Sequence, residues 1–269
     1  MAPSLLRALG PATCIASALA LADRGALSAQ APLPPASTFA VATIKDPPKP
    51  APPPWLIFHA DLGLVSTTGN TDVSTLNFAD ALTSYTSHSN KLGQTFAVTY
   101  GTQNRKVRTS LWTAGLRDEY KLSTDIGIYA LGAFDRNTFA GIEQRFEEGG
   151  GGAITPVHSV QHHLEVDIGG SFIEQRTTAG VNDNFAAARG AFTYQYKFTK
   201  DAYVQEMFDD VSDLKQIKDY RLDSQSSLVA PLSKHIAIKV GYEVRYSNQP
   251  PTGFKTTDRL LTTDLQFNF

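Results

Sequence analysis

The sequence predicts an all-β protein: an antiparallel transmembrane β-barrel of about 12 strands with both termini periplasmic. Three observations lead to this fold class. From Trp55 onward, runs of alternating apolar and polar residues recur between breaks rich in turn-forming residues. The breaks alternate between tight turns and segments that are mostly longer and more polar, such as residues 103–108 and 136–141, as in barrels with short periplasmic turns. In the second set only the first break, around Gly69 and Asn70, is short. Aromatic residues gather near both ends of the expected strands, as in interfacial girdles.

The last stretch, residues 259–269, shows the alternation most clearly. Its apolar face carries Leu261, Thr263, Leu265, Phe267 and Phe269, and polar residues dominate the other face. Such a strand separates two different environments. A final aromatic residue after it resembles the assembly signal of outer-membrane barrels, so Phe269 is the expected assembly signal. A soluble β-sandwich is the alternative, but its strands are shorter and its aromatics fall in strand centres.

The aromatic residues form two bands in the predicted strands. The band near the tight turns contains Trp55, Phe58, Tyr120, Tyr129, Tyr196, Phe198, Tyr203, Phe267 and Phe269. The band near the other breaks contains Tyr100, Trp112, Phe185, Tyr220 and Tyr246. Two segments alternate poorly, residues 143–157 with four consecutive glycines and residues 202–211, so ten strands is the alternative count.

The chain divides into three parts by composition. Residues 1–31, with Arg7 before a short apolar run, predict a secretory signal peptide. Residues 32–54 are rich in proline and predict a periplasmic linker, and residues 55–269 form the barrel. Cys14, the only cysteine, lies in the signal segment. The mature chain therefore offers no disulfide and no thiolate metal site.

Composition excludes several protein classes. The 269 residues carry a net charge of −2 with scattered basic residues, so nucleic acid is not an expected partner. Hydrophobic residues make up 42%, and no apolar run reaches the length of a membrane-spanning helix.

Charged residues share the polar face of the predicted strands and are expected to line the lumen. Because the two signs balance, we expect pairing across neighbouring strands, with a selective pore lining as the alternative. These lumen-facing residues are Asp61, Arg117, Glu119, Glu165, Asp167, Arg189, Arg221, Asp223, Lys239, Glu243, Arg245 and Asp264, and Lys121 and Lys197 on the same face complete the balance of signs.

The turn at residues 233–235 predicts a register. The strands on both sides have their apolar residues at even positions, which requires a three-residue loop. Counting outward places Asp223 opposite Arg245 and Gln225 opposite Glu243. The first of these pairs is expected to form an ion pair in the lumen.

Catalytic and metal sites receive little support. Ser159 and His162 lie near one tight turn without a Gly-x-Ser-x-Gly element, so a lipid hydrolase is only an alternative. His162 and His163 have opposite strand parities, which argues against a single metal site with His158. We expect no catalytic residue, no cofactor and no metal.

Several residues resemble a known family. They are Asp61 to Leu64, Thr68 to Asp72, Phe134 to Arg145, Gly149 to Gly152, and the final strand from Asp258. Over about residues 55–269 the chain resembles the salt-induced outer-membrane proteins, the domain of unknown function 481 family. The resemblance implies an outer-membrane barrel and a link to salt stress, with no catalytic residues and no settled substrate.

The expected function is a role in envelope integrity or passive passage of small solutes, located in the cell outer membrane. The expected partners are outer-membrane lipid, the barrel assembly machinery and a small solute or ion. The alternative is an outer-membrane lipid-modifying hydrolase built on the same barrel.

Removing Phe269, or changing it to Ser, is expected to lower the amount of protein inserted in the outer membrane, because the terminal aromatic residue is the predicted assembly signal. Fractionation and immunoblotting measure the inserted and periplasmic pools. Asn268→Ser, one residue earlier on the polar face, is the matched control. Wild-type insertion of both Phe269 variants would contradict the prediction.

Overall fold

The computed structural model describes residues 55–67, 73–104, 106–138 and 140–269. The predicted signal peptide at residues 1–31 and linker at residues 32–54 lie outside the described residues, and so does most of the first predicted break. Within the described residues, no helix is long and apolar enough to cross a membrane.

The described chain forms 12 strands, which agrees with the predicted count and not with the alternative of ten. The strands are β1 (Leu56–Thr67), β2 (Val73–Tyr85), β3 (Asn90–Gln103), β4 (Lys106–Lys121), β5 (Ile126–Asn137), β6 (Ile142–His158), β7 (His162–Thr177), β8 (Asn182–Lys197), β9 (Tyr203–Asp213), β10 (Tyr220–Pro231), β11 (Ile236–Ser247) and β12 (Thr257–Asn268). The two poorly alternating segments correspond to β6 and β9.

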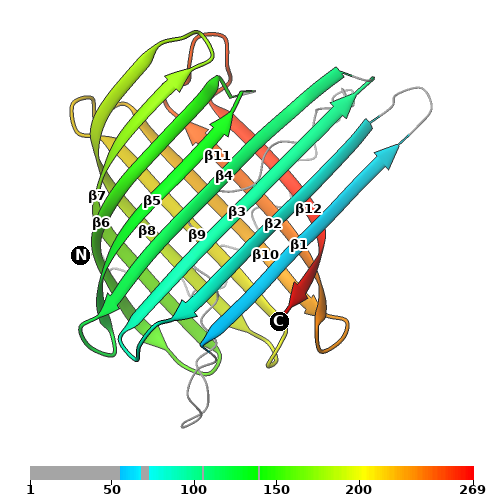
Figure 1. Ribbon diagram of the computed structural model, residues 1–269, viewed down its shortest axis with the longest axis vertical. Helices are drawn as coiled ribbons and strands as arrows, with labels where there is room; N and C mark the ends of the chain where they lie inside the picture. The colour runs from blue at the N-terminus through cyan, green and yellow to red at the C-terminus, as the bar shows by residue number, and fades with distance from the viewer. Residues whose placement is uncertain (1–54, 68–72, 105, 139) are drawn as a thin grey trace, which may run out of the picture. The chain divides into compact units, whose positions relative to one another are not determined.

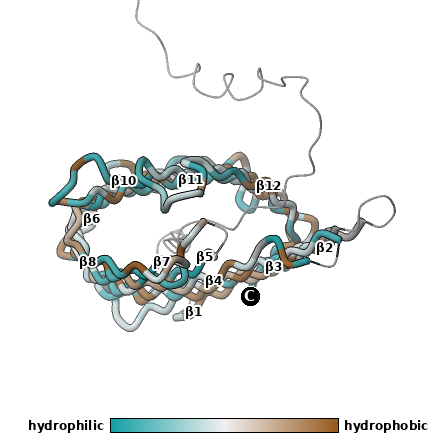
Figure 2. Tube along the Cα trace, turned by 90° about the horizontal axis from the view of Figure 1, so that it is seen from above, coloured by the Kyte–Doolittle hydropathy of each residue, from teal (hydrophilic) through white to brown (hydrophobic). Residues whose placement is uncertain are grey.

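The strands close into one antiparallel barrel (Figure 1). Each strand pairs with its sequence neighbours, and β1 pairs with β12 to complete the ring. Figure 2, which views the barrel from above, shows β10, β11 and β12 on the side of the ring opposite β3 and β4. Phe58 and Phe269 are in ring contact, with centroids 5.9 Å apart, so β1 begins and β12 ends at the same rim. We call it the turn rim, and the opposite end the loop rim.

The barrel has an apolar outside and a polar inside, as a transmembrane barrel requires. On β4, Trp112 and Leu116 are exposed on the outer surface, whereas Thr113 and Glu119 are buried on the inner face. The same pattern repeats on β11, where Ile238, Val240 and Tyr242 are exposed and Glu243 is buried. Strand alternation therefore gives the wall one face for lipid and one for the lumen.

Three aromatic residues of the predicted bands point the other way. Tyr129 and Phe185 are both 5% exposed, and Tyr203 has the strand parity of the buried Gln205 and Asp209 on β9. Their assignment to interfacial bands was wrong because it used their height along the strand and ignored parity. Phe185 instead packs with Ile173, Ala187 and Val211 inside the barrel.

The register predicted for the last hairpins is confirmed. Asp223 pairs with Arg245 and Gln225 with Glu243 between β10 and β11. The backbone amide of Leu232 donates to the carbonyl of Ile236 at 2.8 Å, so residues 233–235 form the three-residue loop.

The difference in length between the connections at the two rims is smaller than the sequence predicts. The break at residues 103–108 was expected to be long, yet β3 ends at Gln103 and β4 begins at Lys106, with Asn104 at a positive φ of 50°. The connection at residues 138–141 is also as short as the turn at 122–125. Strand ends extend further than the polar composition suggested, since polar residues continue to pair at the rim.

Glycines bring β6 and β7 unusually close together. A Cβ atom added to Gly151 would lie 2.2 Å from the backbone oxygen of Ile168, and one added to Gly149 would lie 2.8 Å from that of Gly170. On β7, a Cβ at Gly169 would lie 2.8 Å from the hydroxyl of Tyr129. The glycine run thus permits the close strand approach and leaves room inside for the Tyr129 side chain.

Gly151→Ala is expected to destabilise the barrel by about 1 to 3 kcal/mol, because its methyl group would collide with backbone that cannot rotate away. The measurement is urea unfolding of protein refolded in lipid vesicles. Gly132→Ala on the neighbouring strand β5 is the control, because its Cβ would meet nothing within 4 Å. Equal stabilities of the two variants would show that the close approach is not a constraint.

Candidate functional site in the barrel lumen

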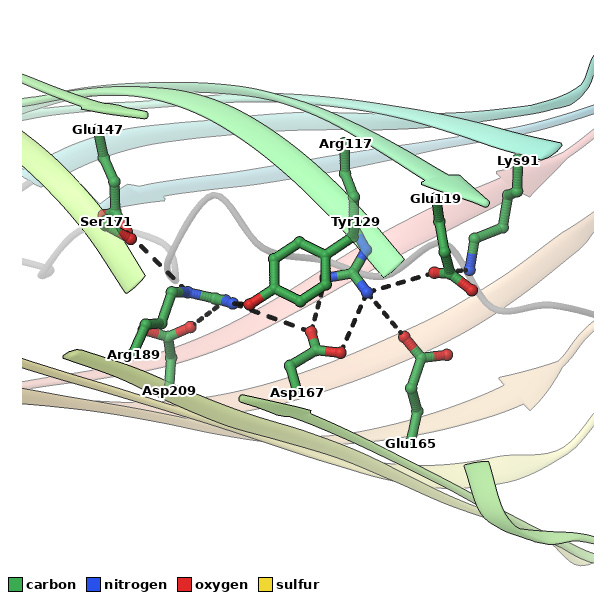
Figure 3. A network of polar contacts seen from close by, with 10 residues as sticks. All are labelled: Lys91, Arg117, Glu119, Tyr129, Glu147, Glu165, Asp167, Ser171, Arg189 and Asp209. Atoms are coloured by element: carbon green, nitrogen blue, oxygen red, sulfur yellow. Dashed lines mark hydrogen bonds and ion pairs between the residues drawn. The ribbon is translucent and has the colours of Figure 1, made fainter. Parts of the chain in front are cut away.

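The candidate site is a buried ion-pair network on the inner faces of β3 to β9 (Figure 3). Its members come from strands that are not all neighbours, so the network spans part of the lumen. We call it the central network, and it consists of Lys91, Arg117, Glu119, Tyr129, Glu147, Glu165, Asp167, Ser171, Arg189 and Asp209.

Arg117 on β4 is the centre of one half of this network. Its guanidinium donates to both carboxylate oxygens of Asp167, at 2.6 Å from Nη1 and 3.1 Å from Nη2. Nη2 also lies 3.3 Å from Glu165 and 3.2 Å from Glu119. Lys91 completes this half at 2.9 Å from Glu119. Because β5 and β6 separate β4 from β7, the Arg117 to Asp167 pair reaches across two intervening strands.

Arg189 on β8 is the centre of the other half. Its side chain is 1% exposed, pairs with Asp209 on β9 and donates to the hydroxyl of Tyr129 on β5 at 3.1 Å. It also lies 4.0 Å from Glu147, whose carboxylate accepts a hydrogen bond from Ser171 at 2.6 Å. Arg117 and Arg189 are thus each held by more than one partner, which offsets the cost of burying their charges.

Tyr129 joins the two halves. The guanidinium carbon of Arg117 lies 4.1 Å from the centroid of the Tyr129 ring, and that of Arg189 lies 5.9 Å away. Figure 3 shows the ring between the two arginines. Cation–π contact on the ring and a hydrogen bond at the hydroxyl fix both guanidinium groups in the lumen.

The network carries more negative than positive groups. Its carboxylates are those of Glu119, Glu147, Glu165, Asp167 and Asp209, and its cations are Lys91, Arg117 and Arg189. A lumen lined by an excess of carboxylates attracts cations and repels anions.

A second charged region lies towards the loop rim, around a cavity of about 100 Å³. Arg145 and Arg245 each lie 3.7 Å from Asp135. Because β5 and β11 occupy opposite positions in the ring, the Arg245 to Asp135 contact joins opposite walls. Arg221 and Asp223 also line this cavity.

All the predicted lumen charges have the parity of the inner face of the barrel, and several of them are in contact with one another. Arg117, Glu119, Glu165, Asp167 and Arg189 meet in the central network, and Lys239 pairs with Asp61 at 2.6 Å. Asp264 is buried beside that pair, in a cavity of about 60 Å³ that Asp61 and Lys239 also line.

The predicted ion pair of Asp223 with Arg245 stays a prediction, and two further carboxylates contact Arg245. Although Asp223 is its register neighbour, the Arg245 guanidinium contacts Glu243 at 2.6 Å and Asp135 at 3.7 Å. Glu243 lies two residues away on the same face of β11. Cross-strand register therefore does not by itself identify the carboxylates that hold this guanidinium.

Sequence reasoning missed several members of the site. They are Lys91, Tyr129, Asp135, Arg145, Glu147 and Asp209. The signal was present for all six, because each has the parity of the inner face on its strand. Contacts between strands that are not neighbours carry no such signal.

The residues considered for catalysis do not form a nucleophile and base pair. The Ser159 hydroxyl accepts from the backbone amide of His162 at 2.9 Å, whereas the His162 imidazole Nδ1 lies 2.8 Å from the Tyr194 hydroxyl. His158 lies 3.2 Å from Asp125 in the neighbouring turn. Over residues 55–67, 73–104, 106–138 and 140–269, no group of three or more His, Cys, Asp or Glu side chains could hold a metal ion.

The sequence profile of a family described as "Protein of unknown function, DUF481" matches residues 60–269. The chain belongs to this family. The match confirms the resemblance seen in the residues. No curated protein matches the sequence.

Several solved structures are similar in fold. The translocator domain of autotransporter NalP from Neisseria meningitidis shares 11% identity, with a TM-score of 0.48 over 80% of this chain and 88% of that chain. The NanC porin shares 8% identity, with a TM-score of 0.46 over 79% of this chain and 97% of that chain. The KdgM porin shares 12% identity, with a TM-score of 0.42 over 80% and 99%, respectively.

Arg117→Ala in this family member is expected to lower the free energy of unfolding by about 3 to 5 kcal/mol, because it leaves three buried carboxylates without their shared cation. Urea unfolding in lipid vesicles measures the change. The control is Arg176→Ala, whose ion pair with Glu143 is half exposed, with an expected loss of about 0 to 1 kcal/mol. A similar small loss for both variants would contradict the structural importance of the central network.

Proposed function

We propose that the protein is an outer-membrane β-barrel that provides a narrow, cation-preferring passage for small solutes and ions. The single observation that carries the proposal is the central network, in which Arg117 and Arg189 reach across part of the lumen between strands that are not neighbours. A 12-strand barrel is wider than the eight-strand kind that side chains fill, so side chains that cross it narrow a lumen of intermediate width.

Charge supports the cation preference. Five carboxylates face three cationic side chains in the central network, and the pairs at the loop rim carry both signs. A small cation passing this point would exchange hydration for carboxylate oxygens, whereas an anion would meet repulsion.

The outer membrane is the proposed location of the protein. The apolar outer surface fits outer-membrane lipid, and we include the barrel assembly machinery as the partner that would insert such a barrel. With both termini periplasmic, the loop rim would face the outside. The salt-induced outer-membrane type, which the family resemblance suggests, agrees with a passage that responds to ions.

We further propose that the protein is not an enzyme. The Ser159 hydroxyl bonds to backbone and the His162 ring bonds to Tyr194, which argues against the lipid-hydrolase alternative. Among the described residues, these were the groups that best fitted such chemistry.

Single-channel recording in planar bilayers tests the passage. The wild-type protein is expected to show small conductance steps with a reversal potential that indicates cation preference. Glu165→Gln should weaken that preference, because it removes one of the buried carboxylates beside Arg117. Glu143→Gln, which removes an exposed carboxylate at the loop rim, is the control and should leave the preference unchanged.

Two results would contradict the proposal. Absence of conductance steps in folded wild-type protein would indicate a closed structural barrel that serves envelope integrity alone. Large steps with anion preference would show that the central network does not control the lumen.

A further inference from the structure

The seam between β1 and β12 is closed along only part of its length. The two strands pair from His59 with Asn268 to Leu62 with Leu265. Beyond this point β1 continues to Thr67, and β12 extends back to Thr257. By contrast, the ladder between β11 and β12 continues along the whole strand, from Ile236 with Phe267 to Tyr246 with Thr257.

The seam therefore contains two strand edges that do not pair with each other among the described residues. They are residues 63–67 of β1 and 257–264 of β12, on the side towards the loop rim. In Figure 1, β1 and β12 lie together at the turn rim and separate above it. Unpaired backbone groups at membrane depth are costly, so such an edge is tolerated only beside protein, water or a polar ligand.

Asp264 marks the point where the ladder ends. Its side chain lies against Gly63, where an added Cβ would be 2.1 Å from the carboxylate oxygen Oδ1. Asp264 is 8% exposed, and its Oδ1 has no hydrogen-bond partner. Glycine at position 63 is thus required for the carboxylate to occupy the inner side of the seam.

Other acceptor atoms face the same cavity of about 60 Å³. Asp61 and Asn77 line it together with Asp264, and Oδ1 of each is buried without a hydrogen-bond partner. The second oxygen of Asp61 binds Lys239 at 2.6 Å, and Asp264 lies opposite Lys239 in the ladder between β11 and β12. Two carboxylates therefore share one cation, which leaves one negative charge in surplus. Three orphaned oxygens need hydrogen-bond donors, and a positive charge on those donors would balance Asp264.

The donor that fits best is organic. The outer surface beside the seam is strongly apolar, with Leu62, Leu64, Leu261 and Leu265 exposed on the two strands. A ligand with an ammonium head and an acyl tail would satisfy both surfaces at once.

We propose that the seam is a lateral portal that binds a primary-amine amphiphile from the surrounding membrane. The ammonium group donates to Asp264, Asp61 and Asn77 inside the wall, and the tail lies against the leucines outside. The site is separate from the passage proposed above, because its residues do not belong to the central network.

The first arm of the test measures whether the seam is open. In a background with Cys14→Ser, the pair Leu62→Cys and Leu265→Cys lies within the ladder and should form a disulfide readily. Positions 64 and 263 would be the next outward-facing pair if the ladder continued. The pair Leu64→Cys and Thr263→Cys should therefore not form a disulfide. Equal oxidation of both pairs would show a closed seam and overturn the proposal.

The second arm measures binding by electron paramagnetic resonance. The folded full-length protein is reconstituted in phosphatidylcholine vesicles with spin-labelled stearylamine, and spin-labelled stearic acid serves as the anionic comparison. The motionally restricted fraction should favour the amine. Asp264→Asn and Gly63→Ala should each lower the relative association of the amine about tenfold, since the charged hydrogen bond is lost or displaced.

Two control variants separate loss of the amine site from general effects of substitution on the barrel. Gly93→Ala is also an inner-face glycine, but its Cβ would meet only the Arg117 backbone oxygen at 3.9 Å, so amine binding should match the wild type. Asp258→Asn removes a carboxylate from the same strand that lines the cavity towards the loop rim and not the cavity beside Gly63, so it should also leave binding unchanged. Equal restriction of amine and acid, or equal binding by all variants, would overturn the proposal.

Discussion

The buried pair between Arg117 and Asp167 is the interaction on which the inside of this barrel depends. It joins β4 to β7 across two intervening strands, whereas ladder hydrogen bonds hold only neighbouring strands together. Glu119 and Glu165 share the same guanidinium, and Tyr129 connects it to Arg189. Removing one member would leave the others buried without compensation, so the network acts as a unit.

The network also explains local features of the wall. The close approach of β6 and β7 at Gly149 to Gly152 leaves space on the inner side, and the Tyr129 hydroxyl lies close to Gly169 on the facing strand. Side chains larger than hydrogen would displace either the strands or the ring. The glycine run, which weakens the alternation signal of β6, is therefore part of what positions the charged groups.

Strand alternation allowed much of the fold to be predicted. Period-two patterning on β11 and β12 identified the inner faces, and the loop at residues 233–235 was sufficient to place Asp223 opposite Arg245. Parity alone would also have placed Tyr129 inside. The ion-pair partners could not be predicted, because Asp135 meets Arg245 from the opposite wall and sequence patterns report only neighbours. Loop lengths were also misjudged, since polar residues at the rim continue to pair.

The Arg117 to Asp167 pair couples β4 to β7 across part of the lumen, and a double-mutant cycle measures that coupling directly. Unfolding free energies would be determined in lipid vesicles for the wild type, Arg117→Ala, Asp167→Ala and the double variant. If the two side chains hold the barrel together as a pair, the coupling energy should be favourable by about 1 to 3 kcal/mol. Additive effects, with a coupling energy near zero, would contradict the central claim that a cross-lumen ion pair organises the interior.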